Sequence, residues 1–135
     1  MVDRVNRDAL FDALHRLRSG ALERSEFAQI PRVKTRDLGV RSIQWVFWLW
    51  CDGAADHQRI DLHDETQAFF HRSLVFLGST REYAWPRWRT MLPAFLRNIG
   101  TKGEFRYWPF QSADEFRLEE QLAQERSYRD CDGPV

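Results

Sequence analysis

The sequence predicts one all-α domain, a single compact bundle of five to six helices around a buried central helix. Three observations support this fold class. The 135 residues are about the length of one domain, and 43% of them are hydrophobic, which is enough for one core. Apolar residues recur every three or four positions in most segments, which is the period of a helix. The run IQWVFWLW at 43–50 is too apolar to face water.

Two helices are expected ahead of the central one. Asn6 is a favourable N-cap for the first, and Ser19–Gly20 is a favourable stop. Between them the apolar residues share one helix face: Leu10, Phe11, Leu14 and Leu17. A second, short helix is expected over Leu22–Gln29, and the basic stretch 31–36 has no period and is expected to be a loop.

The central helix is expected at Val40–Trp50. Periodicity alone leaves a helix and a buried strand open, since β-branched and aromatic residues also favour strands. Roughly 14 residues lie between a cap at Asp37 and a stop at Gly53, and this length favours a helix. Because the segment is apolar on all sides, we expect it in the middle of the bundle.

Two further helices are expected in the second half of the chain. The first covers Leu62–Leu77, with Asp61 or Asp64 as its cap and Gly78–Ser79 as its end. The next should begin at Trp85–Pro86, because proline suits the first position of a helix.

The last helix has the clearest start. Ser112 and Glu115 have the spacing of a capping box, in which each side chain accepts a hydrogen bond from the other residue's backbone. The helix is expected to run to about Ser127, with a frayed tail at 128–135. The segment Glu104–Phe110 before it is expected to be extended, as a lone strand or a packed loop.

Charge is balanced over the whole chain but uneven along it. The 20 basic and 20 acidic residues give no net charge, which argues against nucleic acid or a membrane surface as the partner. Segment 72–106 has seven basic and two acidic residues, whereas 107–135 has three and seven, so the C-terminal helix is expected beside the basic segment. Two distant cysteines and the absence of a targeting or membrane-spanning segment predict a cytoplasmic protein.

The candidate binding residues lie at two Trp–Pro corners, 83–88 and 107–110. A residue before proline is held extended, so each tryptophan ring has a fixed direction. Packing of both corners in the core is the favoured interpretation, whereas exposure beside arginine would mark a protein contact surface. The candidate contact residues are Trp85, Arg87, Trp88, Arg89 and Trp108.

Two alternative functions rest on composition. The His/Asp cluster at 52–71, with His57, His63 and His71, has metal-binding residue types and suggests a metal-dependent enzyme, but its spacing matches no known metal motif. The Arg/Trp segment 81–97 has the residue types that stack single-stranded nucleic acid, but its helical spacing favours core packing. Neither alternative is preferred, and no catalytic residue, metal site or cofactor is predicted.

Three stretches of the sequence carry a resemblance to a known family: NRDALFDALHRLRSG followed by EFAQIP, FLGSTREYAWP, and YWPF. In these the chain resembles a family of small bacterial proteins of unknown function with the pattern NRxAL…FLxSxxEYxWP…YWPF. The resemblance implies a small helical domain with no established activity. By analogy, some proteins of this size and type are immunity or accessory factors beside toxin genes.

These observations together predict a non-enzymatic, cytoplasmic protein-binding module. The chain lacks a catalytic motif and a net charge, and it is rich in tryptophan and arginine, which are enriched at binding hot spots. The expected partner is another protein or a second copy of the chain, rather than a membrane or a nucleic acid.

Overall fold

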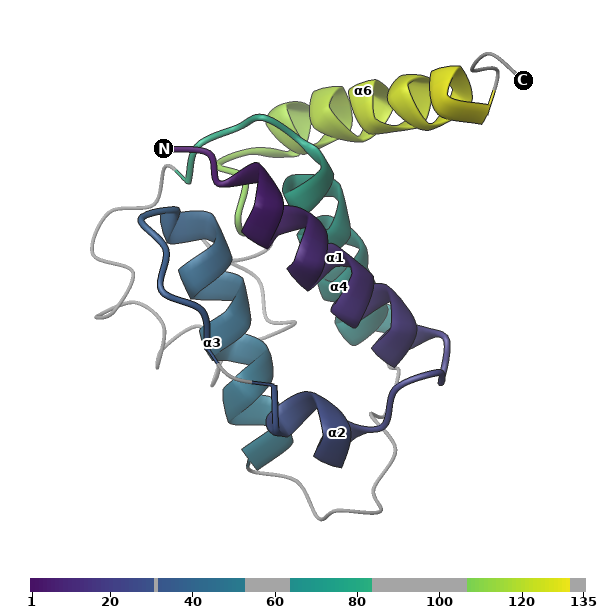
Figure 1. Cartoon of the computed structure of the whole chain (residues 1–135). Helices are drawn as coiled ribbons and strands as arrows, with labels where there is room; N and C mark the ends of the chain where they lie inside the picture. Colours follow the sequence, from purple (N-terminus) through teal and green to yellow (C-terminus); the bar gives the residue numbers. More distant parts are fainter. Residues whose placement is uncertain (31, 53–63, 84–106, 132–135) are drawn as a thin grey trace.

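The structure, a computed structural model, describes residues 1–30, 32–52, 64–83 and 107–131 (Figure 1). Within these ranges the chain forms five helices and no strand, so the all-α prediction is confirmed. The helices are α1 (Arg4–Arg18), α2 (Arg24–Ala28), α3 (Leu38–Asp52), α4 (Asp64–Gly78) and α6 (Ala113–Cys131). The helix predicted to begin at Trp85–Pro86 lies outside the described residues.

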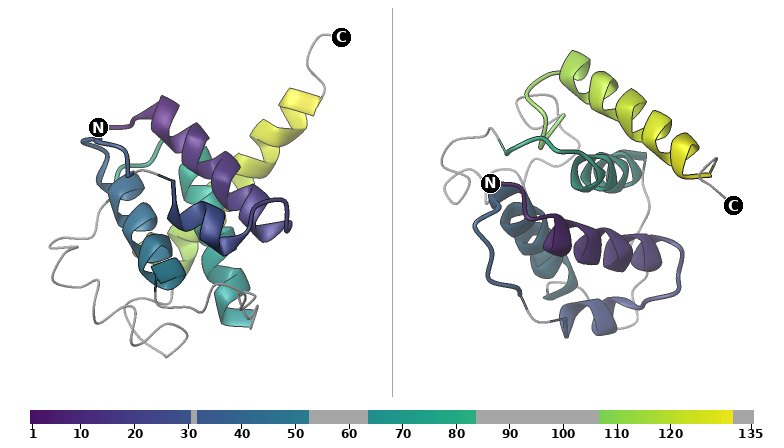
Figure 2. Two further views of the ribbon diagram at one scale, coloured as in Figure 1. Left: turned by 60° about the horizontal axis from the view of Figure 1, so that its bottom comes forward. Right: turned by 45° about the horizontal axis from the view of Figure 1, so that its top comes forward.

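The centre of the bundle consists of α1, α3 and α4, which contact one another. The short α2 packs across α1 and α3, while α6 contacts α4 alone among the described helices. Figure 2 shows α4 lying between α6 and the pair formed by α1 and α3. The C-terminal end of α6 extends beyond the rest of the bundle (Figure 1). Helices α2 and α6 therefore lie on opposite sides of the central three.

The core is built mainly from aromatic side chains of α3 and α4. Phe47 is fully buried, and its ring centroid lies 5.2 Å from that of Phe69 and 4.6 Å from that of Phe70. Phe27 of α2 meets the same ring edge-on, at 6.2 Å between centroids. Each such pair adds about 0.5–1.5 kcal/mol to the stability that burial supplies.

Helix α3 corresponds to the predicted central helix, and it contacts α1, α2 and α4. It is not buried on all sides, because one of its faces reaches the surface. Four of its apolar side chains have no exposed surface: Val40, Ile43, Val46 and Phe47. A second stripe at helical spacing stays partly exposed: Leu38, Arg41, Trp45 and Trp48. The apolar character of this segment thus serves the core on one side and the protein surface on the other.

The first helix begins earlier than its apolar pattern predicts. Asp3, not Asn6, is the N-cap, because the Asp3 carboxylate accepts a hydrogen bond from the backbone N–H of Asn6 at 3.1 Å. Asn6 itself lies inside the helix, and its side-chain amide donates to the same carboxylate. At the other end the helix stops at the predicted place, and Gly20 adopts a left-handed conformation with φ of 82°.

The start of α6 confirms the capping prediction and corrects the segment before it. Ser112 Oγ accepts a hydrogen bond from the N–H of Glu115 at 3.1 Å, while the Glu115 carboxylate accepts from Gln111, one residue before the cap. The described part of the segment predicted to be extended, 107–110, is a tight turn that buries Trp108 and Phe110 in the core. Helix α6 also runs four residues past its predicted end, to Cys131.

Helices α3 and α4 approach closely where α3 begins. A Cβ atom placed on Gly39 would lie 2.1 Å from Cε1 of Phe76, far inside the contact distance of two carbon atoms. Gly39 and Phe76 are both buried, so the Phe76 ring cannot move into solvent to make room for a Cβ atom. This crossing therefore requires a residue without a side chain.

We expect Gly39→Ala to lower the free energy of unfolding by about 1–3 kcal/mol, the usual cost of forcing an extra carbon into a packed core. Urea denaturation followed by circular dichroism measures the loss. Gly78→Ala is the matched control, because a Cβ there meets nothing within 4 Å. That control should be neutral or should stabilise by up to about 1 kcal/mol. Equal effects at the two positions would contradict the packing argument.

Candidate functional site

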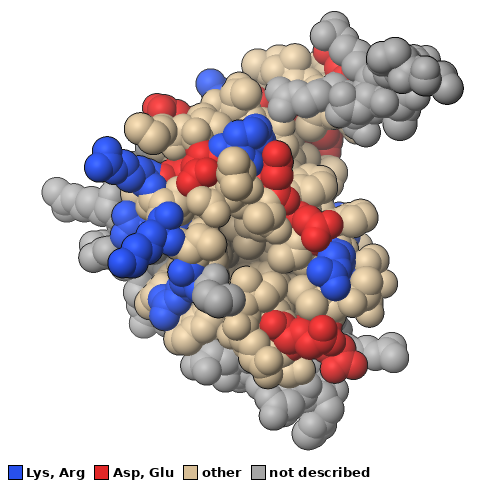
Figure 3. All heavy atoms as spheres, in the orientation of Figure 1, with Lys and Arg blue, Asp and Glu red and all other residues tan. Residues whose placement is uncertain are grey.

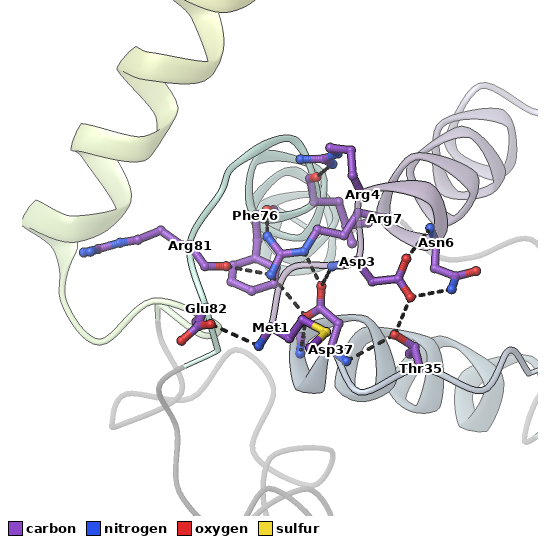
Figure 4. Close-up of polar contacts among 12 residues, drawn as sticks. Met1, Asp3, Arg4, Asn6, Arg7, Thr35, Asp37, Phe76, Arg81 and Glu82 are labelled. Atoms are coloured by element: carbon purple, nitrogen blue, oxygen red, sulfur yellow. Dashed lines mark hydrogen bonds and ion pairs between the residues drawn. The ribbon is translucent and has the colours of Figure 1, made fainter.

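A network of polar groups lies where the N-termini of α1 and α3 meet the C-terminus of α4 (Figure 4). We call this network the polar hub. It consists of five side chains together with backbone carbonyl groups at and after the end of α4: Asp3, Arg4, Arg7, Thr35 and Asp37. The hub joins segments that are more than 30 residues apart in the sequence, so it is a product of the tertiary fold.

Arg7 is the centre of the hub. Its side chain is fully buried and forms a two-pronged ion pair with Asp37, which is 2% exposed: Nε donates at 2.5 Å and Nη2 at 3.1 Å. Its other donors reach the carbonyl oxygens of Ser79 at 3.0 Å, Arg81 at 2.6 Å and, at 3.4 Å, Phe76. A guanidinium group has five N–H donors, so each has an acceptor. The Phe76 ring also packs on its flat face, 4.5 Å away.

Arg4 and Arg7 of α1 complete the C-terminus of α4. The last carbonyl groups of a helix lack partners within the helix, and cations near them are favourable. Helix α4 has no basic residue in its own last turn. Arg4 supplies donors instead, to the carbonyl oxygens of Leu77 and Ser79. The first turn of α1 is thereby fixed against the end of α4.

Asp37 is held in its charged form. Burial by itself raises the pKa of this carboxyl, but hydrogen bonds from Arg7 and from the backbone N–H of Asp3 outweigh it and hold the pKa below the ordinary value. The N–H of Gly39 donates to the same carboxylate at 3.1 Å. Asp37 is thus the cap that the sequence predicted for α3, and it is also the counterion of Arg7.

Thr35 connects the caps of α1 and α3. Its hydroxyl donates to the Asp3 carboxylate at 2.6 Å and accepts from the N–H of Asp37 at 3.1 Å. The bonds from Thr35 and Asn6 lower the pKa of Asp3. Because the donors of Arg7 are taken up by the protein itself, we interpret the hub as a structural lock rather than a ligand site.

Sequence reasoning missed this hub, although one signal was present. Arg7 stands three residues before Leu10 and lies on the same helix face as Leu14 and Leu17, all of which are buried. A charged residue in line with a buried apolar stripe indicates a buried ion pair. Its partner, Asp37, follows from the tertiary structure alone.

A second feature is a surface pocket between α1, α2, the segment that follows α2, and the middle of α3, which we call the basic cleft. It encloses about 70 Å³, and its walls are largely apolar, including Leu10, Ala13, Phe27, Val33 and Trp48. Small-molecule sites usually enclose about 300–1,000 Å³. The basic cleft is therefore large enough for the end of one aliphatic side chain, not for a cofactor.

Arg32 lies at the mouth of the basic cleft, over two tryptophans. Its guanidinium carbon is 4.7 Å from the ring centroid of Trp45 and 4.4 Å from that of Trp48. The two rings stack on each other at 5.6 Å. Such cation–π contacts contribute about 0.5–1 kcal/mol each at exposed sites. They hold a long, charged side chain in one place at the protein surface.

The edge of the basic cleft continues as a line of cations. Arg32, Lys34 and Arg36 are all exposed, and they alternate with Thr35 and Asp37, which face the hub. Figure 3 shows basic side chains gathered on this edge of the molecule, over the segment that joins α2 to α3. This segment was predicted only as a basic loop.

Of the five predicted contact residues, the structure describes only Trp108. Trp85, Arg87, Trp88 and Arg89 lie outside the described residues, so their exposure stays a prediction. Trp108 is only 2% exposed, so its role as a surface contact is corrected: it belongs to the core, as the favoured interpretation of its corner had it.

Trp108 has partners on both of its sides. Its ring stacks on that of Phe69, with centroids 5.3 Å apart, and its Nε1–H donates to the Tyr83 hydroxyl at 3.1 Å. Burial raises the pKa of that hydroxyl. The indole N–H, which would be costly to bury alone, is therefore satisfied inside the fold.

Of the predicted His/Asp cluster, only one histidine is described. His71 pairs with Glu120 and stands edge-on to the ring of Phe116, so it joins α4 to α6. His57 and His63 lie outside the described residues. In the part of the chain that the structure describes, no three potential metal-binding side chains come together.

The acidic C-terminal helix does pack against the basic segment. Arg81 pairs with Glu115 at 2.9 Å and with Glu119 at 3.2 Å. The described contacts thus agree with the expected charge complementarity.

A scan against models of known protein families finds no match to this chain, and searches of curated proteins and of solved structures find none either. Within the described residues, no helix combines the length and the apolar character needed to cross a membrane.

We expect Arg7→Ala to lower the free energy of unfolding by about 3–5 kcal/mol, because it leaves the Asp37 carboxylate buried without its counterion. Arg7→Lys keeps the charge but offers three donors in place of five, so it should recover only part of the loss. Chemical denaturation measures both, with the exposed Arg18→Ala as a control that should change little. Losses below about 1 kcal/mol in both Arg7 variants would contradict the role of the hub.

Acid should weaken the hub through Asp37. Its pKa is lower in the folded than in the unfolded protein, so its contribution is complete above the unfolded value, near 4, and is lost as the pH falls through the lower folded value. The free energy of unfolding, measured from pH 7 to pH 2, should fall less steeply in Asp37→Asn than in the wild type. An identical pH dependence in the two proteins would show that Asp37 is not held charged.

Proposed function

We propose that this chain is a non-enzymatic protein-binding module and that the basic cleft is its contact surface. The observation that carries the proposal is Arg32, held across Trp45 and Trp48 at the mouth of an apolar pocket. Tryptophan and arginine are the residues most enriched at binding hot spots. The partner would insert one aliphatic side chain and place carboxylates beside Arg32, Lys34 and Arg36.

The physical properties of the basic cleft support a protein partner. The pocket is too small for most small-molecule ligands, and its lining offers few polar groups: Asn6, Arg32 and Gln44. A small apolar pocket with a charged rim is the usual form of a protein contact, in which the buried centre supplies affinity and the rim supplies orientation. The line of cations also creates a local positive field in a chain of zero net charge.

The remaining parts of the proposal come from the sequence. A chain with two cysteines suits a reducing compartment, so we place the module in the cytoplasm. By analogy with some proteins of its size and type, we propose an immunity or accessory factor that masks a partner. The metal-enzyme and nucleic-acid alternatives rest on 52–71 and 81–97, which lie largely outside the described residues, and both stay predictions.

The test compares three immobilised proteins: the wild type, Arg32→Glu/Lys34→Glu, and Arg16→Glu/Arg18→Glu. The last pair carries the same change of charge at exposed positions in the last turn of α1, beyond Ala13, which is the last residue of that helix that lines the basic cleft. Partner proteins captured from lysate of the native cell are quantified by mass spectrometry. We expect at least one protein to be retained by the wild type and the control but lost tenfold or more by the cleft variant, about 1.4 kcal/mol.

Circular dichroism must first show that all three proteins are folded. The same set of captured proteins on all three columns would contradict the proposal. A third outcome is capture that is lost in the cleft variant and is also lost when nucleic acid in the lysate is digested. This outcome would favour the nucleic-acid alternative instead.

A further inference from the structure

We infer that the basic cleft binds helix α6 of a second copy of this chain, so that copies join head to tail through two different surfaces. The inference rests on the proposed function, because it names the partner of the same cleft. Helix α6 is the starting point, because one apolar face of this helix is exposed rather than packed against the bundle.

Helix α6 has two apolar faces. One face packs on α4 and the core through Phe116 and Ala123. The other carries Leu118, which is 52% exposed, and Leu122, which is 41% exposed. These two leucines are four residues apart, so they are neighbours on one side of the helix. They form an apolar surface that the described part of the chain leaves open.

Carboxylates flank this leucine pair. Asp114 lies four residues before Leu118, and Glu125 lies three residues after Leu122, so both fall on the same helix face. Both are exposed. The other described glutamates of the helix that face the bundle pair with Arg81 or His71. The acidic groups that remain at the surface therefore surround the exposed leucines.

The two surfaces are complementary in chemistry. The basic cleft offers an apolar pocket for one aliphatic side chain, with Arg32 in its wall. Two more exposed cations, Lys34 and Arg36, follow along the same segment. The α6 surface offers two leucines between two carboxylates. Leucine side chains bury well in such pockets, and opposite charges at the rim fix the register of the contact.

The two surfaces also agree in length. Arg36 follows Arg32 by four residues of non-helical chain, which span at most about 14 Å. Asp114 and Glu125 are separated by 11 helical residues, which span about 16 Å. Long side chains on both surfaces can cover the difference in length.

The α6 helix of the same copy cannot reach the basic cleft. The pocket is lined from α1, α2 and α3, whereas α6 contacts α4 on the opposite side of the bundle (Figure 2). An α6 helix that occupies the cleft must therefore come from another copy. Because the two surfaces differ, each copy presents one donor helix and one acceptor cleft, which is a heterologous contact.

Sedimentation of the full chain tests the inference, with two variants that each remove one surface. Leu118→Gln/Leu122→Gln leaves the cleft intact, and Arg32→Glu/Lys34→Glu leaves the helix intact. We expect the wild type to associate at low salt below about 1 mM, and each variant to associate at least tenfold more weakly. Added salt should weaken the wild-type contact. The control Arg16→Glu/Arg18→Glu should associate as the wild type does.

Mixing the two variants is the decisive step. One intact helix and one intact cleft then meet, so a head-to-tail contact predicts that the mixture forms a dimer that neither variant forms alone. A wild type that stays monomeric up to about 1 mM would overturn the inference. So would a mixture that fails to associate, or association that the cleft variant keeps while the leucine variant loses it, since that result assigns the contact to two α6 helices.

The test separates this inference from the proposed function. If the wild type is monomeric while its capture of another protein depends on the cleft, the second copy is the wrong partner and the proposed function stands. If neither association nor capture depends on Arg32 and Lys34, both are overturned.

Discussion

The buried ion pair between Arg7 and Asp37 is the interaction on which the arrangement of three helices depends. Arg7 belongs to the first turns of α1, Asp37 precedes α3, and the carbonyl groups that share the guanidinium belong to the end of α4 and the residues after it. Removing two charges from water costs several kcal/mol per ion, so such a pair persists only where its polar atoms are all matched. A shift of any one helix end would leave a buried group without a partner, and the pair therefore selects one arrangement.

The same interaction positions the basic cleft. Asp37 is held by Arg7, and Thr35 is held between Asp37 and Asp3. With these two residues facing inward, the cations at 32, 34 and 36 remain at the surface. The hub contacts on one side of this segment and the exposed cations on its other side therefore both follow from the alternation of inward and outward residues between 32 and 37. A rigid basic edge loses little conformational entropy when a partner binds.

Arginine has three distinct roles in this chain, and the zero net charge conceals them. Arg7 is a buried structural cation that replaces a core residue on the apolar face of α1. Arg81 binds α6 through two glutamates at the edge of the bundle. Arg32 lies flat on tryptophan rings at the surface, which lysine does poorly because its ammonium group is compact and strongly hydrated. Burial and partner, rather than residue type, decide which role each one has.

The sequence by itself determined the features that depend on neighbours within one or two helical turns. The helical period of the apolar residues, the turn at Gly20, the cap at Asp37 and the pairing of Ser112 with Glu115 are all of this kind. These interactions involve residues only a few positions apart in the sequence, so the local pattern specifies them.

Only the tertiary structure decided which side chains are buried and which reach the surface. Trp48 and Trp108 stand in similarly apolar stretches, yet Trp48 borders an open pocket and Trp108 is in the core. The candidate contact surface was therefore expected at the Trp–Pro corners, whereas the described residues place a basic, aromatic surface at Arg32. Burial of a ring depends on helices that come from positions tens of residues away, and so does the partner of Arg7. No local pattern contains that information, because it arises when the helices pack.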